Sequence, residues 1–154
     1  MFAKMPYHIR NATPDDMLAL EKLLTAFMQE TSQGLWGGTT QKLAQDGFGA
    51  EFQMVVAKAE NQQLVAFAAW ISSYDLHHCI KGGEIIDMFV EPAHRGRGVV
   101  IQLIMAIAPK FNNRAVYISK DRQSRTQAPN VSISGAPIVF REPIVMCLDA
   151  LFGD

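Results

Sequence analysis

Two arginines and two glycines alternate at Arg95–Gly98, immediately before an apolar segment that begins at Val99. The first backbone N–H groups of a helix lack an intrahelical partner and lie at the positive end of the helix dipole. Glycine lets an anion approach the backbone closely, and arginine adds positive charge. The spacing after Val99 indicates a helix, so this loop predicts a cradle for phosphate, with a pyrophosphate as the natural ligand.

Two common nucleotide-binding loops do not fit this stretch. A P-loop requires a lysine followed by serine or threonine, and a Rossmann loop requires a third glycine. The loop offers Gly96 and Gly98 alone. The plain alternative is an ordinary strand-to-helix turn, in which the glycines serve backbone geometry and the arginines are solvated.

The segments around this loop alternate between strand-like and helix-like patterns. Strands are predicted at Tyr7–Asn11, Phe52–Ala59, Leu64–Tyr74, Glu84–Val90, Ala115–Ser119, Ile138–Phe140 and Ile144–Leu148. Helices are predicted at Thr13–Thr31, Thr39–Gln45 and Val99–Phe111. We expect Thr13 to be an N-cap, Gly82-Gly83 to break the chain before Glu84, and Pro109 to kink or end the last helix.

This order of elements predicts an α/β fold, a central mixed sheet flanked by helices. At least one right-handed crossover is expected, from the strand at Glu84 through the helix at Val99 to the strand at Ala115. The length of 154 residues fits a single domain that spans residues 1–154.

Charge and cysteine content narrow the functional classes. A net charge of -1 and a pI near 6.4 do not favour a nucleic-acid partner. Cys79 and Cys147 lie outside any CxxC pair and fit a reducing cytoplasm. The neighbours His77, His78 and Cys79 are not expected to bind metal, because successive strand residues point to opposite faces. The apolar runs are shorter than the roughly 20 residues of a membrane span.

The loop and the strand before it resemble the acetyl-CoA signature of the GCN5-related N-acetyltransferase (GNAT) family. That signature reads Q/R-x-x-G-x-G/A after a strand that ends in an apolar-x-Pro-like turn. Arg95 fills the first position and Gly98 the central glycine, whereas Val100 stands where the family has Gly or Ala. A branched side chain there is expected to crowd the pyrophosphate or to push the helix outward. The wider resemblance covers most of the chain.

The resemblance implies a GNAT-like acyl-CoA N-acyltransferase fold and acetyl-CoA as acyl donor. Backbone amides of the signature loop would hold the pyrophosphate, and the pantetheine arm would pair with the signature strand like an extra strand. The N–H of Phe89 or Val90 would then polarise the thioester carbonyl. The implied coenzyme A-binding residues are Met88, Phe89, Val90, Arg95, Gly96, Arg97, Gly98, Val99 and Val100.

The attacking amine must lose a proton, so the resemblance also implies a base. Glu84 on the signature strand is the first candidate, with a solvated strand end as its alternative. Asp87 is the second, and a regular strand would point it to the face opposite Glu84. The tyrosine that the family often uses as general acid has no counterpart in Asp121–Ser134, and Tyr117 lies inside a predicted strand.

The acceptor site would lie beyond the thioester, walled by the first helical region and the hairpin. Its candidate residues are Glu30, Trp36, Trp70 and Asp75. Core packing is the alternative for both tryptophans.

Three functional hypotheses follow from these residues. The first is an enzyme that moves an acetyl group from acetyl-CoA to an amine of a small molecule, a peptide or a protein. The second is a catalytically silent acyl-CoA-binding module. The third, disfavoured by the net charge, is a nucleic-acid binder that uses the arginines and lysines of residues 95–125. A homodimer paired through the sheet ends is compatible with the resemblance.

Overall fold

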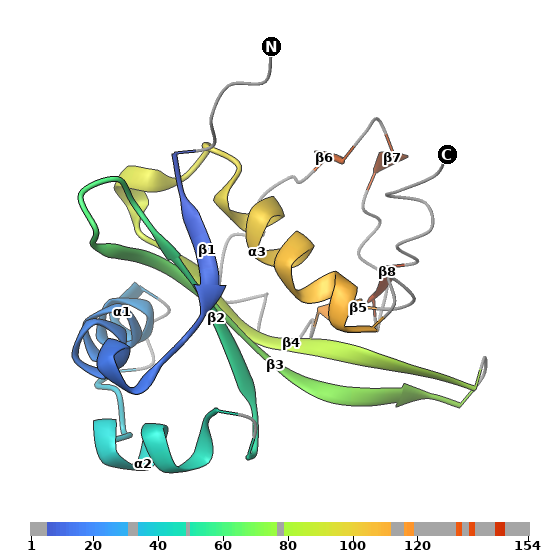
Figure 1. Ribbon diagram of the computed structural model, residues 1–154, viewed down its shortest axis with the longest axis horizontal. Helices are drawn as coiled ribbons and strands as arrows, with labels where there is room; N and C mark the ends of the chain where they lie inside the picture. Colours follow the sequence, from blue (N-terminus) through green and yellow to red (C-terminus); the bar gives the residue numbers. More distant parts are fainter. Residues whose placement is uncertain are drawn as a thin grey trace.

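The computed structural model contains a six-stranded sheet with the order β1-β2-β3-β4-β5-β8 (Figure 1). It describes residues 6–30, 34–48, 50–76, 79–111, 116–118, 132–133, 136–137 and 144–146. The strands are β1 (His8–Asn11), β2 (Gln53–Lys58), β3 (Leu64–Asp75), β4 (Ile80–Val90), β5 (Val116–Ile118) and β8 (Ile144–Met146). A separate pair is formed by β6 (Ser132–Ile133) and β7 (Ala136–Pro137). β4 and β5 run parallel, and the other described neighbours run antiparallel, so the predicted mixed sheet is confirmed.

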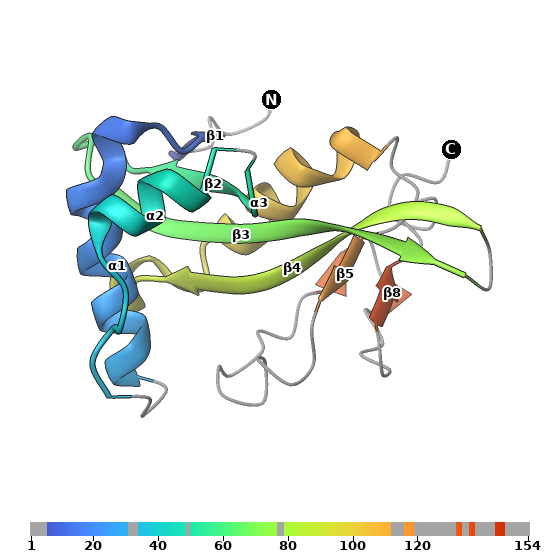
Figure 2. The same cartoon turned by 90° about the horizontal axis from the view of Figure 1, so that it is seen from below.

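The helices are α1 (Met17–Glu30), α2 (Thr40–Asp46) and α3 (Val99–Ile107), with short 3-10 turns η1 (Pro14–Asp16), η2 (Pro92–His94) and η3 (Ala108–Phe111). α1 and α2 cover one face of the sheet and α3 covers the other (Figures 1 and 2). α3 stops just before Pro109, as predicted, because proline lacks the N–H that the next turn needs. In the described residues no helix has both the length and the apolar character needed to cross a bilayer.

The first helical region begins where Thr13 predicts. The Thr13 backbone N–H donates to Oδ2 of Asp16 at 2.7 Å. Arg10 on β1 donates to the two oxygens of the same carboxylate at 2.7 and 2.8 Å. The hydrogen bond from Arg10 lowers the pKa of Asp16, which is only 6% exposed. A partly buried, ionised pair therefore fixes the start of the helix against the edge strand.

Two apolar cores lie on the two faces of the sheet. The α1-side core comprises Leu20, Leu23, Leu24, Phe27, Met54, Val56, Leu64, Phe67, Ala69 and Phe89. The α3-side core includes Tyr7, Val55, Ala57, Ala66, Ala68, Trp70, Ile85, Val90, Val99, Leu103, Ile104 and Ile107. Since successive strand residues point to opposite faces, membership of a core shows which face each side chain occupies.

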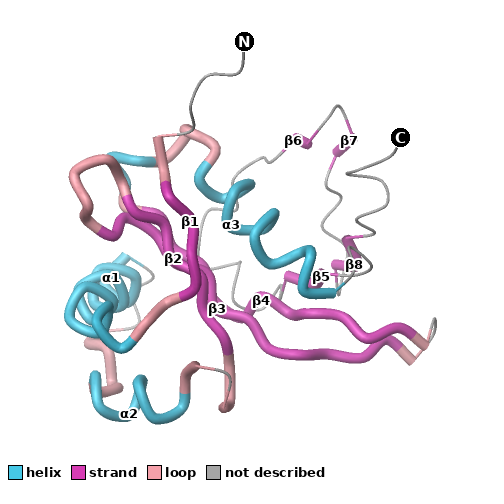
Figure 3. The backbone as a smooth tube through the Cα atoms, in the orientation of Figure 1, coloured by secondary structure: helices cyan, strands magenta, loops and turns pink. Residues whose placement is uncertain are grey.

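β4 is longer than the sequence predicts. Gly82 and Gly83 were expected to break the chain, but they lie inside the strand and pair with Ser73 and Ser72 of β3. Gly83 also pairs with Val116 of β5. Strands on both sides supply the hydrogen bonds, and this tertiary context overrides the weak strand preference of glycine. The result is the long β3–β4 hairpin that extends to one side in Figure 3. The predicted strand at Ile138–Phe140 lies outside the described residues.

Candidate functional site

The loop Arg95–Gly98, predicted to be a phosphate cradle, directly precedes α3. Gly96 and Gly98 have φ angles of 75° and 78°, a left-handed conformation that favours glycine. Gly98 is the N-cap of α3, and its carbonyl accepts the N–H of Gln102 at 3.2 Å. The N–H groups that precede that of Gln102 have no intrahelical partner and remain available to a ligand. The loop residues are exposed, so an anion can reach these amides.

The turn before the cradle is anchored by an aromatic contact. The Tyr7 hydroxyl lies 2.9 Å from Nδ1 of His94, and the two rings meet edge to face at 5.7 Å between centroids. Tyr7 is buried in the α3-side core. His94 directly precedes Arg95, so this contact holds the entrance of the loop. No sequence pattern marked this pair, because 87 positions separate its members.

The branched side chain of Val100 stays in contact with the core. It is half-buried and packs against the α3-side core. The departure from the family's Gly or Ala at this position was expected to crowd a pyrophosphate or displace the helix. The contact with the core gives part of the extra volume a place away from the loop.

The two arginines of the cradle have different surroundings. Nη2 of Arg95 donates to Oε2 of Glu30 at 2.5 Å, and Nε of Arg95 donates to the Val90 carbonyl at 2.9 Å. The Arg95 guanidinium also lies 5.6 Å from the centre of the Phe89 ring. Arg97 is exposed and, within the described part of the chain, has no hydrogen-bond or ion-pair partner. Arg97 is therefore the arginine free to meet a phosphate.

The last residues of β4 present peptide groups to an unpaired edge. The Glu91 N–H donates to the Val65 carbonyl on β3 at 2.9 Å. Because successive peptide groups along a strand point to opposite edges, the N–H groups of Val90 and Met88 face away from β3, whereas that of Phe89 faces β3. Of the two predicted donors, Phe89 and Val90, the second has the suitable direction.

This edge lies next to β5 but extends past its described pairing. β5 pairs with β4 over Gly83–Ile85, and the described residues place no strand beside Ile86–Val90 on that side (Figure 2). An extended ligand can add to such an edge by main-chain hydrogen bonds. The Val90 carbonyl faces this edge as well and accepts a hydrogen bond from Nε of Arg95.

A β-bulge interrupts β4 beside this edge. The ladder pairs Ala69 with Asp87 but Trp70 with Ile85, so Ile86 is the extra residue. Ile85 belongs to the α3-side core, whereas Ile86 packs against the α1-side core. The alternation of side chains is therefore reset between Ile86 and Asp87.

The bulge brings both predicted base candidates to one face. Asp87 pairs with Ala69, a member of the α1-side core. Glu84 pairs with Ile71. Trp70, which precedes Ile71, belongs to the α3-side core, so Ile71 faces the α1 side. Because directly paired residues share a face, Glu84 and Asp87 both lie on the α1 side. The expectation of opposite faces is wrong, since it assumed a regular strand. Both side chains are half-buried within the strand, so Glu84 is not a solvated strand end.

The four predicted acceptor residues do not gather at one place. Trp70 is 3% exposed in the α3-side core, on the face opposite the two acids, which agrees with the core-packing alternative for this residue. Trp36 is half-buried against the α1-side core, on the same face as the acids. The Glu30 carboxylate is bound by Arg95, which lowers its pKa. Asp75 ends β3, and its side chain lies outside what the structure describes.

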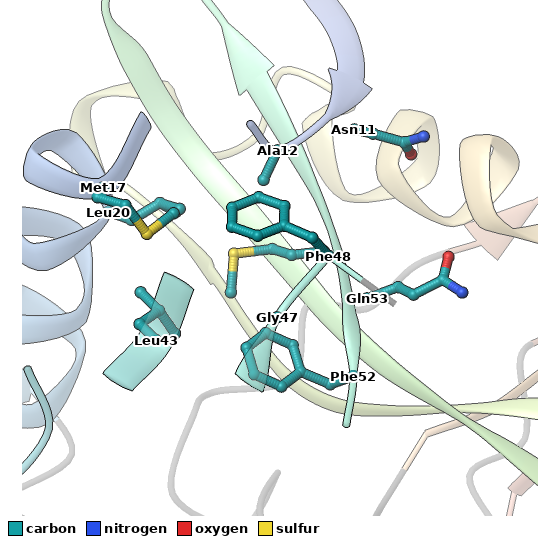
Figure 4. Close-up of a pocket in the computed structure, with 10 residues that line it drawn as sticks. Asn11, Ala12, Met17, Leu20, Leu43, Gly47, Phe48, Phe52 and Gln53 are labelled. Atoms are coloured by element: carbon teal, nitrogen blue, oxygen red, sulfur yellow. The ribbon is translucent and has the colours of Figure 1, made fainter. Parts of the chain in front are cut away.

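A separate apolar pocket of about 310 Å³ opens on the α1 side (Figure 4). It is lined by Asn11, Ala12, Met17, Leu20, Leu43, Gly47, Phe48, Phe52, Gln53 and Met54. These described lining residues include no acid or base, so proton transfer cannot be assigned there. Met54, Ala69 and Asp87 form one row across β2, β3 and β4, which sets the pocket two strands from Asp87. The sequence did not reveal the pocket, because its lining comes from α1, α2 and β2, which are distant in the chain.

Metal-ligating residues do not cluster in the part of the chain that the structure describes. No group of three or more His, Cys, Asp and Glu side chains is arranged to hold an ion there. His77 and His78 lie outside the described residues, and Cys79 is exposed.

Comparison with known proteins identifies the family of this chain. Residues 18–128 match the family model described as Acetyltransferase (GNAT) family. The match spans more than half of the chain, and the chain belongs to this family. A search of curated proteins finds no match.

Solved structures of other proteins share the fold. The ribosomal-protein-alanine N-acetyltransferase of Brucella melitensis biovar Abortus 2308 is 15% identical, with a TM-score of 0.61, over 88% of this chain and 99% of that one. An acetyltransferase of Trypanosoma brucei is 20% identical, with a TM-score of 0.58, over 77% and 85%. An integron cassette protein from V. cholerae is 16% identical, with a TM-score of 0.62, over 89% of each chain. At these identities the similarity establishes the fold alone.

Proposed function

We propose that this chain is a single-domain N-acetyltransferase that moves an acetyl group from acetyl-CoA directly to a primary amine. The observation that carries the proposal is the relation between the cradle and the end of β4. A diphosphate on the amides of residues 96–100 would bring the arm of the same ligand along the unpaired edge of β4. The Val90 N–H faces that edge. One extended acyl-CoA can thus contact the cradle, the unpaired edge of β4 and the Val90 N–H.

Acetyl-CoA supplies an acetyl group activated as a thioester. In the proposed reaction the amine nitrogen bonds to the carbonyl carbon, the bond from carbon to sulfur breaks, and the sulfur leaves as a thiolate. The Val90 N–H stabilises the negative charge that develops on the carbonyl oxygen. A carboxylate on the α1 face accepts the proton that the amine loses.

Asp87 is the better placed of the two carboxylates. It lies three positions from Val90, whereas Glu84 lies six positions away. At about 3.3 Å of rise per residue, Asp87 is roughly 10 Å along the strand from Val90, a span that one or two waters and a side chain can bridge. Glu84 would need a longer water chain, and we assign it the secondary role. The thiolate takes its proton from water, because Asp121–Ser134 contains no tyrosine.

The missing tyrosine also supports a second candidate function, a catalytically silent acyl-CoA-binding module. Release of free thiol from acetyl-CoA, followed across a panel of amines, separates the two. Turnover with any amine supports the enzyme, and tight coenzyme A binding without turnover supports the module. For either function we place the chain in the cytoplasm, alone or as a homodimer.

Thermal denaturation with acetyl-CoA tests the binding step that both functions need. A ligand that binds only the folded chain raises the midpoint, by the equivalent of about 2.7 kcal/mol at a hundredfold excess over the dissociation constant. Gly98→Glu should remove this rise, because it puts a carboxylate beside the cradle. Gly98→Ala is the matched control. It imposes the same strain at φ 78°, but it adds no charge. A rise that survives in Gly98→Glu would contradict the assigned cradle.

A further inference from the structure

One side chain joins the end of α1 to the start of the cradle. Arg95 contacts Glu30, the last residue of α1, through a hydrogen bond of 2.5 Å. The same guanidinium reaches the Val90 carbonyl at 2.9 Å and lies 5.6 Å from the centre of the Phe89 ring. Arg95 thus touches α1 and the end of β4 while its own backbone belongs to the loop.

In these contacts the positive charge of Arg95 is paired with the Glu30 carboxylate. The hydrogen bond from Arg95 lowers the pKa of Glu30, so the pair is ionised at neutral pH. Both side chains are partly exposed, at 44% and 39%, and such a pair adds little to stability. Its geometry is more informative than its energy, because the guanidinium fork fixes direction as well as distance.

Through these contacts Arg95 connects the two sides of the site. The cradle holds the donor, and the α1 face carries the proposed base and the half-buried Trp36. The Val90 peptide lies between them, since its carbonyl accepts from Arg95 and its N–H faces the donor edge. A change in the loop that moves Arg95 must move Glu30 or break the ion pair.

We propose that Arg95 is a positioning residue that couples occupation of the cradle to the C-terminal end of α1, and not a ligand of the diphosphate. The inference rests on the proposed function, because it takes acetyl-CoA as the ligand of the cradle. Arg97 and the loop amides bind the diphosphate and hold the loop. Arg95, held with it, fixes the end of α1 and the Val90 peptide. By linkage, an acceptor that binds against α1 strengthens donor binding by the same factor.

Hydrogen–deuterium exchange with saturating acetyl-CoA tests this coupling in the full chain without knowledge of the acceptor. In the wild type, acetyl-CoA should slow exchange in the loop and also in the C-terminal half of α1, each by about fivefold or more, the lower end of common coupling factors. Arg95→Gln should keep the protection of the loop and lose that of α1. Glu30→Gln should do the same from the other partner, and it keeps the test open if Arg95→Gln does not fold.

Glu21→Gln is the matched control, because Glu21 is exposed on the same helix and contributes only its backbone carbonyl to a described contact, with Thr25. In Glu21→Gln, acetyl-CoA should still protect α1 from exchange. Loop protection without α1 protection in the wild type overturns the coupling and leaves the proposed function intact. The coupling is also overturned if α1 protection is unchanged in both Arg95→Gln and Glu30→Gln. Absence of protection anywhere contradicts both proposals.

Discussion

Glu84 and Asp87 lie on the same face of β4, although three positions separate them and a regular strand would place them on opposite faces. The bulge at Ile86 causes this, since it inserts one residue into the ladder with β3. Two carboxylates are thereby directed to the α1 side, near the strand edge that offers the Val90 N–H. A β-bulge re-aims side chains and bends its strand locally.

Asp87→Asn and Glu84→Gln test which carboxylate accepts the proton. Because a positioned base contributes about 10²- to 10⁴-fold, Asp87→Asn should lower kcat by that factor. Glu84→Gln should lower it less. Both variants should keep the acetyl-CoA-induced rise in melting temperature, since neither residue belongs to the cradle. The reverse order of effects on kcat would move the role to Glu84.

Val90→Pro tests the proposed donor amide. Proline removes the N–H that faces the unpaired edge but no hydrogen bond of the ladder with β3, so the strand should tolerate it. Loss of one such donor costs about 10²- to 10³-fold in kcat. Val90→Ala removes the same side chain but keeps the N–H, and steady-state kinetics of the two variants isolate the amide. Equal kinetics in the two would exclude this N–H from the reaction.

Asp16→Asn should destabilise the fold in a pH-dependent way. The Arg10 hydrogen bond lowers the pKa of Asp16 in the folded chain. The stabilisation is therefore present above the pKa of the unfolded carboxyl, about 3.9, and is lost as pH falls through the lower folded value. A hydrogen bond to a charged group contributes about 1.5–3 kcal/mol.

Urea unfolding at pH 7 and at pH 2 measures this difference. The gap between Asp16→Asn and the wild type should be clear at pH 7 and should shrink at pH 2. Asp15→Asn is the control, because Asp15 is an exposed neighbour in the same turn. A gap that stays constant with pH would mean that packing, and not the ion pair, is responsible.

Thr39→Ala should weaken α2 and with it one wall of the apolar pocket. The Thr39 hydroxyl accepts the Lys42 N–H at 3.1 Å and caps the helix. Loss of such a cap costs about 1 kcal/mol. Thr39→Ser keeps the hydroxyl and should retain most of the stability. Chemical unfolding of the three proteins gives the comparison, and similar losses in both variants would show that the methyl group matters more than the cap.

Local features of the site could be predicted from the sequence. The loop at Arg95–Gly98, the helix after it, the Thr13 start and the stop at Pro109 each depend on a few adjacent residues. Their backbone angles, missing N–H groups and helix-end charges are properties of those residues themselves. The resemblance to the GNAT family rested on this same stretch, and the family match confirms it.

The direction and partner of each side chain were decided only by the tertiary structure. The bulge at Ile86, the edge that the Val90 N–H faces, the burial of Trp70 and the pairing of Arg95 with Glu30 all depend on which strand or helix lies alongside. A one-residue change in register reverses every face of a strand. No local pattern encodes that register, because it is set by contacts between segments that lie far apart in the chain.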